Sequence, residues 1–312
     1  MKIEKYSADL ESEVIFRGLC AHCGTCGAFC PHIKYYEEGP DAGLPYILDS
    51  CMENVGVCYN ACPRANLNTS ELEQKVFNKT REDQILGVYL EKILVKKGKK
   101  SILNSLIETA FKNGIIDAMV VPKQSSKKPV NNIGIIARNI NDVPELNSLN
   151  LNYTGPLVAG INEAAKEGFK SVGLIGNPCH HQGITKILYS DFNTRANFCG
   201  LKIAIMCASG GAKGCIYCVD YTGEFSDISY SETGQEKESA VLLVRTEKGK
   251  KLVDLAIKDK LITKISDTPN LEKIIDFATK KKTKNIRNII NKSVAKIGYL
   301  ELNESEISVY LK

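Results

Sequence analysis

A run of four cysteines near the start of the chain constrains its fold most. Residues 20–31 read Cys-Ala-His-Cys-Gly-Thr-Cys-Gly-Ala-Phe-Cys-Pro, which is the spacing C-x2-C-x2-C-x3-C-P. This spacing is typical of chains that bind iron–sulfur clusters, where three closely spaced thiolates surround one cluster and the fourth serves another. Glycine permits the tight backbone between them, and the proline turns the chain away. The run therefore predicts a segment that bound metal, rather than a large core, holds together.

A second cysteine motif completes this segment. Residues 51–64 also end in C-x3-C-P, and together the two motifs predict a ferredoxin-like iron–sulfur module over residues 1–70. In the simplest assignment one cluster is bound by Cys20, Cys23, Cys26 and Cys62, and a second receives three ligands from Cys30, Cys51 and Cys58. A full second run would have a cysteine near Val55. The second cluster therefore has a non-cysteine ligand, is a three-iron form, or is absent.

The same thiols could bind zinc instead. Four-cysteine zinc sites usually consist of two separated C-x2-C pairs, whereas three cysteines at consecutive three-residue steps suit a cube-shaped cluster better. We therefore favour iron–sulfur clusters over zinc for this module.

Composition narrows the class of protein. The chain has 312 residues, 25% of them charged, with a net charge of +5 and no Trp. Because cluster-bound thiolates add negative charge that this count leaves out, and because stacking residues are scattered, we predict no nucleic-acid partner. No stretch approaches the roughly 18 apolar residues of a membrane span, so we expect a cytoplasmic protein without one. Twelve cysteines in a reducing compartment indicate metal binding rather than disulfides.

The rest of the chain alternates predicted helices and strands. Residues 71–100 are interpreted as a link, and residues 101–312 as an α/β domain with a C-terminal helical tail, whose lysines are interpreted as a solvated helix face. A helix is expected over 101–113 and another over 156–168; strands are expected over 115–121, where Pro122 ends the strand, and over 133–137, 171–175, 201–206 and 240–244. The predicted fold is a mixed, mostly parallel sheet flanked by helices.

Four further cysteines follow the ends of predicted strands in this domain. They are Cys179, Cys207, Cys215 and Cys218. Ligands of such sheets gather beyond the carboxyl ends of the strands, so these thiols form a complete ligand set for another four-iron cluster. Cys199 is interpreted as a small buried hydrophobe instead. His180 and His181 are either ligands or proton donors, or capping and solvated residues at a helix start.

The ordered series of motifs resembles the β subunit of coenzyme F420-reducing hydrogenase and the F420-linked dehydrogenases. Besides the first cysteine run it comprises Gly56-Val-Cys58-Tyr, Cys62-Pro-Arg64, Leu86-Gly-x-Tyr89, Asn177-Pro-Cys179, Cys207, Cys215-x2-Cys218-x-Asp220, Ser226-Asp-Ile-Ser229 and Arg245-Thr246. The resemblance extends from about residue 18 to the tail. Each motif is unspecific alone, whereas the order of the series is specific.

The resemblance implies an oxidoreductase subunit that contains FAD and two or three [4Fe-4S] clusters. Coenzyme F420 is then the substrate, and electrons pass through the clusters to a partner subunit of a hydrogenase, formate dehydrogenase or related complex. A flavin suits this role because it accepts a hydride and releases single electrons. The cofactor-binding residues that the resemblance implies are Lys100, Ser101, Tyr153, Thr154, Gly155 and Asn177; no catalytic side chain is assigned.

Two departures from the family leave alternatives open. Lys100 and Ser101 stand where relatives have a Gly-Gly pair, and only eight positions separate Cys207 from Cys215, where relatives often have several dozen residues. A flavin-free or F420-independent electron-relay subunit is therefore the alternative function. A zinc-stabilised interaction protein is the third.

Overall fold

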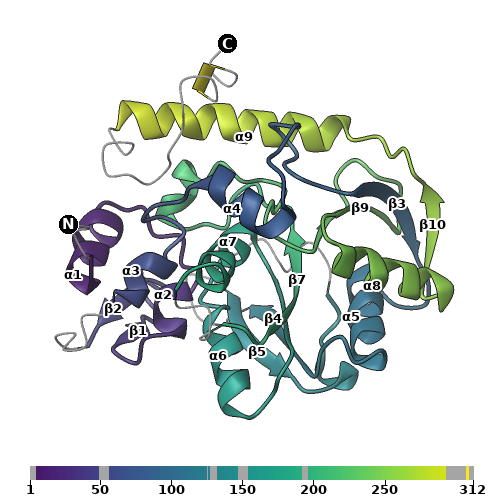
Figure 1. The fold of residues 1–312 in the computed structure, drawn as a ribbon, viewed down its shortest axis with the longest axis horizontal. Helices are drawn as coiled ribbons and strands as arrows, with labels where there is room; N and C mark the ends of the chain where they lie inside the picture. The colour runs from purple at the N-terminus through teal and green to yellow at the C-terminus, as the bar shows by residue number, and fades with distance from the viewer. Residues whose placement is uncertain are drawn as a thin grey trace.

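The computed structural model describes residues 5–48, 56–124, 126, 132–146, 154–191, 196–292 and 307–308. Figure 1 shows an elongated molecule with the N-terminal module at one end and α8 and β10 at the other. A long helix, α9 (Glu272–Asn291), runs along one side of the molecule between these two ends.

The N-terminal module consists of short elements around the cysteine motifs. In chain order these are α1 (Ser7–Asp9), the π-helix η1 (Leu10–Ile15), α2 (Thr25–Ala28), β1 (Ile33–Tyr35), β2 (Pro45–Ile47) and α3 (Val57–Ala61). Strands β1 and β2 pair antiparallel. Both α2 and α3 begin after a glycine in the left-handed conformation, Gly24 and Gly56, which a side chain would strain. The glycines of both cysteine motifs thus start the helices that carry the next thiols.

An eight-stranded sheet forms the centre of the remaining structure. Its strands are β3 (Glu91–Lys97), β4 (Ala118–Gln124), β5 (Asn132–Ala137), β6 (Val172–Gly176), β7 (Cys199–Ile205), β8 (Ile228–Ser231), β9 (Ser239–Val244) and β10 (Ile262–Ser266), in the order β10-β3-β9-β8-β7-β6-β4-β5. The predicted mixed α/β class is confirmed. Parallel pairing is confined to the central strands β4, β6, β7 and β8, and the outer pairs are antiparallel.

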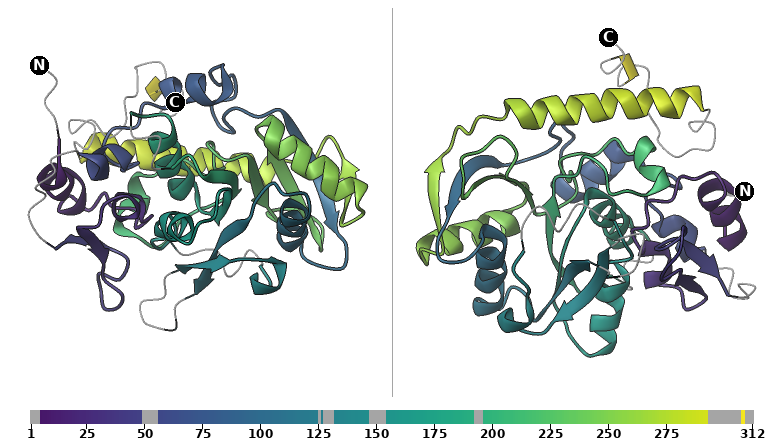
Figure 2. Two further views of the ribbon diagram at one scale, coloured as in Figure 1. Left: turned by 60° about the horizontal axis from the view of Figure 1, so that its bottom comes forward. Right: turned by 180° about the vertical axis from the view of Figure 1, so that it is seen from behind.

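Helices cover both faces of the sheet. The helices of this region are α4 (Thr69–Phe77), α5 (Ile102–Lys112), η2 (Ile140–Asp142), α6 (Ala159–Lys166), α7 (Pro178–Leu188), η5 (Lys213–Tyr217) and α8 (Glu247–Lys258). Because side chains alternate along a strand, the odd and even positions of β4 enter different cores. Met119 and Val121 pack with α5 and α8, whereas Ala118 and Val120 pack with α6, α7 and the N-terminal helices α2 and α3. The N-terminal module therefore shares a core with the sheet (Figure 2).

Side-chain hydrogen bonds cap the first turn of several of these helices. The hydroxyl of Ser101 accepts from the amide of Asn104 at the start of α5, and Thr246 accepts from Gly249 at the start of α8. Such caps satisfy amides that have no partner within the helix. The predicted helix over 101–113 is confirmed with its boundary at the cap.

Two details of the strands differ from the sequence expectations. Pro122 does not end its strand: β4 continues to Gln124 and pairs there only with β5, so the missing amide of Pro122 can face the side that has no partner. In addition, β3 lies within residues 71–100 and joins the main sheet next to β9. The division of the chain into three parts stays a prediction. No helix of the described residues is long and apolar enough to cross a membrane.

Candidate iron–sulfur sites

The cysteines predicted to bind the first cluster line one cavity in the N-terminal module. Cys20, Cys23, Cys26 and Cys62 all border it. Three of these thiols are buried and Cys20 is half-buried. Apolar side chains of η1, the ring of Tyr35, His22 and Arg64 are among the other residues that line it. Three local thiols and one distant thiol thus line the same cavity, and their role as ligands of one cluster stays a prediction.

The surroundings of this first thiol group stabilise negative charge on sulfur. The amide of His22 donates to Cys20 Sγ and the amide of Arg64 donates to Cys62 Sγ, each at 3.4 Å. Tyr35 holds the segment from Gly24 to Gly27 in place, because its hydroxyl donates to the Gly24 carbonyl and accepts from the Gly27 amide. Burial raises the pKa of Cys62 to about 11, so the free thiol stays protonated at neutral pH. A bound metal would supply the charge that makes it a thiolate.

The second thiol group lies at the carboxyl ends of the parallel strands. Cys179 is in the first turn of α7, which follows β6, and Cys207 follows β7. Cys215 lies in η5, and Cys218 directly follows it. Burial raises the pKa of Cys179, and nearby Cys23 of the first group, followed by Cys218 and Cys215, raises it further. All four cysteines thus lie at or beyond the carboxyl ends of β6 and β7, and their shared role as ligands stays a prediction.

Asn177 belongs to the second thiol group through its side chain. Its Nδ2 donates to Cys207 Sγ at 3.1 Å, and both residues are buried. Hydrogen bonds to ligating sulfurs help to set the reduction potential of a cluster. The resemblance implies a cofactor-binding role for Asn177; the structure directs its side chain at a thiol.

Helix α9 holds the loop of the second thiol group by its backbone carbonyls. Lys281 Nζ donates to the carbonyls of Cys207 at 2.6 Å and Asp220 at 2.9 Å. Asn285 Nδ2 donates to the carbonyls of Cys215 at 3.1 Å and Cys218 at 2.7 Å. The interpretation of this lysine-rich helix as a solvated face is wrong at these positions, because Lys281 and Asn285 are buried against the loop.

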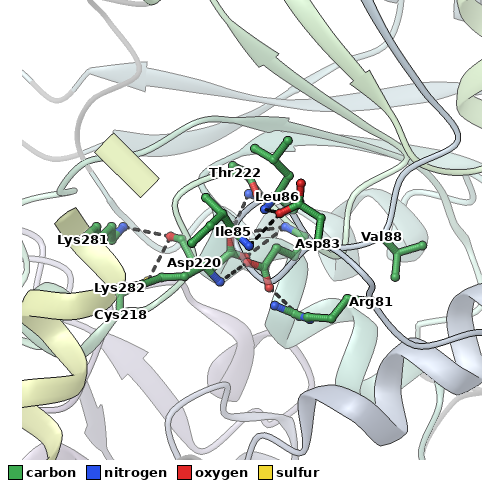
Figure 3. A network of polar contacts seen from close by, with 12 residues as sticks. Arg81, Asp83, Ile85, Leu86, Val88, Cys218, Asp220, Thr222, Lys281 and Lys282 are labelled. Atoms are coloured by element: carbon green, nitrogen blue, oxygen red, sulfur yellow. Dashed lines mark hydrogen bonds and ion pairs between the residues drawn. The ribbon is translucent and has the colours of Figure 1, made fainter. Parts of the chain in front are cut away.

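A buried ion-pair network anchors α9 next to the same loop. Lys282 Nζ lies 2.5 Å from Glu224, whose other oxygen lies 2.7 Å from Arg81; Arg81 also lies 2.6 Å from Glu73. Burial alone would raise the pKa of Glu224, but Arg81 and Lys282 lower it to about 2. Figure 3 shows Arg81, Lys281 and Lys282 converging on the segment of Asp220 and Thr222.

Cys218 differs from the other thiols of its group. Burial raises its pKa, but the Lys281 ammonium and the Arg64 guanidinium together lower the pKa below its usual range. Cys207, where burial dominates, has its pKa raised to about 11. Nearby cations therefore outweigh burial in setting the pKa of Cys218, but not that of Cys207.

The two thiol groups are in direct contact. Cys23 of the first group and Cys179 of the second pack together with Ala21 in one small cluster. Glycines permit this approach: a Cβ at Gly24 would lie 2.5 Å from the Cα of Pro156, and a Cβ at Gly183 would lie 2.1 Å from the Thr25 hydroxyl. Lys186 of α7 also donates to the Cys62 carbonyl at 2.7 Å. The motif analysis predicts both groups but not this contact.

The structure describes only some of the remaining predicted ligands. Cys58 is buried in the core of the N-terminal module, and Cys30 is half-buried against the same core. Cys51, their predicted companion, lies outside the described residues. Cys199 is buried at the start of β7, away from both groups in the sheet, as the hydrophobic interpretation expects.

His180 and His181 are both fully buried, which excludes the solvated interpretation. His180 Nδ1 accepts from the Asn177 amide at 2.8 Å, and its Nε2 lies 2.9 Å from the Gly155 carbonyl. Burial lowers the pKa of His180 to about 4 and that of His181 to about 3. Both rings are therefore neutral at physiological pH, and His180 serves as a cap of α7.

The residues that the resemblance assigns to FAD make other contacts. Lys100 is exposed and pairs with Glu108 at 2.8 Å, and the Ser101 amide donates to the Glu145 carboxylate at 3.3 Å. Thr154 is buried, and its hydroxyl donates to the Gly210 carbonyl at 3.0 Å. Tyr153 lies outside the described residues.

The cavity at this end of α5 also carries the wrong charge for a phosphate. Its charged lining consists of Glu145, Glu232, Glu236 and Glu238 together with Lys97 and Lys237. A pyrophosphate is favoured at a helix N-terminus when the amides there are free, but here a carboxylate occupies the first of them. The described residues at Lys100 and Ser101 therefore do not fit the phosphates of FAD.

Among the described residues, no three His, Cys, Asp or Glu side chains gather closely enough to hold a metal ion. The choice between zinc and an iron–sulfur cluster therefore still rests on the cysteine spacing, because zinc binds its ligands in one tetrahedron. A cube-shaped cluster binds each thiolate through a different iron, and its ligands stand farther apart. The four thiols that border one cavity in the N-terminal module are the donor set that such a group requires.

Comparisons with known proteins agree with these sites. Residues 13–63 match the model of a 4Fe-4S dicluster domain, and residues 208–270 match that of the C-terminal domain of the coenzyme F420 hydrogenase/dehydrogenase β subunit. The first match contains every cysteine of the N-terminal module, and the second contains Cys215 and Cys218. The fold and the sites thus define an iron–sulfur protein built on an α/β sheet.

Three individual proteins have sequences similar to this chain. A coenzyme F420-dependent sulfite reductase of Methanocaldococcus jannaschii is 25% identical over 59% of this chain and 27% of its own length. The β subunit of coenzyme F420 hydrogenase from Methanococcus voltae is 22% identical over 47% of this chain and 72% of its own length. An uncharacterized protein of Methanocaldococcus jannaschii is 24% identical over 90% of this chain and 99% of its own length. The chain thus spans about a quarter of the sulfite reductase.

A solved structure shares the fold. A chain of the F420-reducing [NiFe] hydrogenase complex from Methanosarcina barkeri superposes with a TM-score of 0.60 at 19% identity, over 68% of this chain and 94% of that one. The resemblance predicted from the ordered motifs, to the β subunits of F420-linked hydrogenases and dehydrogenases, is confirmed.

Proposed function

We propose that this protein is an electron-transfer subunit of an oxidoreductase complex, with a [4Fe-4S] cluster at each of its two four-cysteine groups. The contact between Cys23 and Cys179 carries the proposal, because it joins the two groups into one path. The third cluster predicted from Cys30, Cys51 and Cys58 extends that path within the N-terminal module.

Bound clusters supply one-electron oxidation and reduction. The side chains of the protein prepare the two groups for this chemistry. Amide donors to Cys20 and Cys62, and the Asn177 amide donor to Cys207, stabilise the thiolates. Cys62 and Cys207 are buried, and burial strengthens such interactions.

The finer proposal is that electrons enter as a hydride from coenzyme F420, with FAD between F420 and the clusters. The family match over residues 208–270 supports it. The acidic lining of the α5 cavity and the Ser101–Glu145 contact speak against FAD phosphates at the residues assigned to them. We therefore favour the relay that works without FAD at Lys100 and Ser101, and keep the F420-linked flavoprotein as the second candidate.

A relay of this kind requires a partner on each side. The relatives are named as a hydrogenase subunit and a sulfite reductase, so we propose a hydrogenase, a dehydrogenase or a related reductase as the partner. A cytoplasmic location is part of the same proposal.

Quantitative iron, sulfide and flavin analysis of anaerobically purified full-length protein tests the function. We expect about eight irons per chain from the two four-cysteine groups, with up to about four more from the third, and a broad absorption shoulder near ~400 nm. Protein that contains zinc or no metal after anaerobic reconstitution with iron and sulfide would overturn the proposal.

The flavin content and a stopped-flow assay distinguish the two candidates. Reduced protein that lacks flavin and leaves oxidised F420 unbleached supports the relay. Stoichiometric FAD together with rapid bleaching of F420 would establish the flavoprotein and reject our preference. Bleaching without flavin would place hydride transfer elsewhere in the chain and reject both.

A further inference from the structure

A large cavity lies away from both thiol groups. Its volume is about 700 Å³, which is within the range of about 300–1,000 Å³ that small-molecule sites have. Cys199, the first residue of β7, and Asp227, which directly precedes β8, both line it, whereas Cys207 follows the last residue of β7. The cavity therefore lies at the amino ends of the parallel strands, across the sheet from the second thiol group.

The lining of this cavity contains a buried ammonium. Lys202 is 8% exposed, and its Nζ donates to the hydroxyl of Thr185 at 2.9 Å. An ammonium has three donors, and this hydrogen bond uses one of them on a neutral partner. Among the residues that the structure describes, Lys202 forms no ion pair. Because a buried charge is costly without a compensating charge or full hydrogen bonding, this side chain favours an anion in the cavity.

The nearby carboxylate does not fill that role. Asp227 is buried in the same lining, but its Oδ2 accepts from the backbone amide of Lys202 at 2.8 Å and its Oδ1 accepts from the Thr246 hydroxyl at 2.7 Å. Arg245 is a second buried cation of the lining, and its guanidinium donates to hydroxyl and carbonyl oxygens, which are neutral. The floor of the cavity thus keeps a positive balance of charge.

The rim adds further cations, and one wall is apolar. Lys79 and Lys248 are exposed and line the cavity together with the exposed carboxylate of Glu247. Lys248 lies in the first turn of α8, a helix of 12 residues, where the helix dipole also favours an anion. The half-buried side chains of Phe77 and Leu188 form the apolar part of the lining.

We propose that this cavity binds an organic phosphate, with the phosphate at Lys202 and Lys248 and a ring-bearing apolar body against Phe77 and Leu188. Four cations and two carboxylates line the cavity, and a phosphate monoester, with a charge of about −1.5 to −2 at neutral pH, offsets the difference. A carboxylate would offset only half of it. The inference does not depend on the iron–sulfur function.

The test is isothermal titration calorimetry of the full-length, anaerobically prepared protein with three probes. AMP has both the phosphate and the ring, adenosine has only the ring, and inorganic phosphate has only the charge. Lys202→Met removes the buried ammonium, and Lys248→Glu reverses a charge at the rim. Lys284→Glu is the matched control, because Lys284 is exposed on α9, which contributes no residue to the lining.

We expect the wild-type protein to bind AMP more tightly than either fragment. Lys202→Met and Lys248→Glu should each weaken AMP about tenfold or more, because each removes a charged partner of the phosphate, and should leave the affinity for adenosine unchanged. Lys284→Glu should change the affinity for AMP by less than about twofold, since its charge is screened at that distance. Absence of AMP binding at millimolar concentration in the wild-type protein, or inorganic phosphate bound as tightly as AMP, would overturn the inference.

Lys248→Glu decides the question if Lys202→Met does not fold, as judged by circular dichroism. The side chain of Lys248 is exposed, and an acidic residue in the first turn of a helix is favourable, so this variant should keep its fold. Weaker AMP binding in Lys248→Glu than in Lys284→Glu supports the site. Equal affinities in these two variants would show that AMP responds only to net charge or binds elsewhere, and would overturn the inference.

Discussion

The two thiol groups hold the same number of cysteines but are built in different ways. In the first group, three thiols lie within seven residues, and the module's own side chain, Tyr35, fixes the intervening loop. In the second, Cys179 and Cys207 come from separate strand ends, and α9 binds the carbonyls around Cys207, Cys215 and Cys218. The first site is thus defined by local spacing, and the second by tertiary structure.

This difference predicts how each site fails. A site defined by local spacing loses its metal when a ligand is lost, whereas a site framed by distant elements also fails when the frame is disturbed. Substitutions that separate ligand, frame and contact between the groups therefore test the comparison.

Removal of a ligand has the largest expected effect. Cys218→Ser should lose about four irons per chain and keep those of the N-terminal module, because the first group shares no ligand with the second. Iron analysis and the resonance signals of the remaining clusters measure this. Cys199→Ala is the matched control and should keep all its iron; equal iron content in both variants would contradict the assignment of Cys218.

Removal of the anchor of α9 comes next. Lys282→Met leaves Glu224 with Arg81 as its remaining cation partner at this network. Breaking a buried ion pair costs about 3–5 kcal/mol, so we expect lower stability and earlier loss of iron from the second group than from the first on heating. The temperature dependence of the two resonance signals measures the order.

Exposed Lys280 provides the control for this anchor. Lys280→Met removes an exposed pair with Asp276 and should change stability by less than about 1 kcal/mol.

The ion-pair network of Glu224 also predicts a pH dependence of stability. Because the pKa of Glu224 falls from 4.5 to about 2 on folding, its contribution is complete above about pH 4.5 and disappears as the pH falls towards 2. Simultaneous iron loss from both groups in Lys282→Met would show that α9 does not frame the second group specifically.

The contact between the groups is tested by a glycine pair. Gly24→Ala places a Cβ 2.5 Å from Pro156, in addition to the strain of a left-handed backbone, whereas Gly18 has the same conformation with nothing within 4 Å. We expect Gly18→Ala to cost about 1–2 kcal/mol and Gly24→Ala about 1–3 kcal/mol more. Denaturant unfolding followed by circular dichroism measures both. Equal losses of stability in the two variants would show that the backbone around Pro156 moves aside at no cost in free energy.

The smallest effect concerns Cys199, which belongs to neither group. Burial raises its pKa to about 11, so its alkylation by iodoacetamide should be slow at pH 8 and rise about tenfold per pH unit until about pH 11. Mass spectrometry of the iron-loaded protein, in which ligating thiols are protected, measures the rate. A plateau near pH 9 would show that Cys199 is accessible and ordinary.

The comparison also explains which parts could be predicted from sequence. The first group is predictable because a run of thiols at fixed spacing has few solutions, and Cys62 follows from its own C-x3-C-P motif. The location of the second group is predictable from strand ends, since parallel strands place their carboxyl ends at one edge of a sheet; its role as a ligand set stays a prediction. The mixed α/β class follows from the same alternation.

The frame of the second group is not predictable in this way. Lys281 and Lys282 lie in a lysine-rich helix whose pattern indicates a solvated face, and only the path of α9 across the molecule buries them. Strands β3, β8 and β10 are also missed, because the exposed lysines of β3 resemble a link, and β8 and β10 have only four and five residues.

The position of α9 has a consequence for how the protein is made. Ribosomes deliver the chain from its N-terminus, so the first thiol group is complete once Cys62 has emerged, long before the sheet exists. The second group receives its last support only when Lys281 and Asn285 emerge. Cofactor loading in the cell should therefore proceed in two stages, with the N-terminal site filled on the growing chain and the other filled only near the end of synthesis.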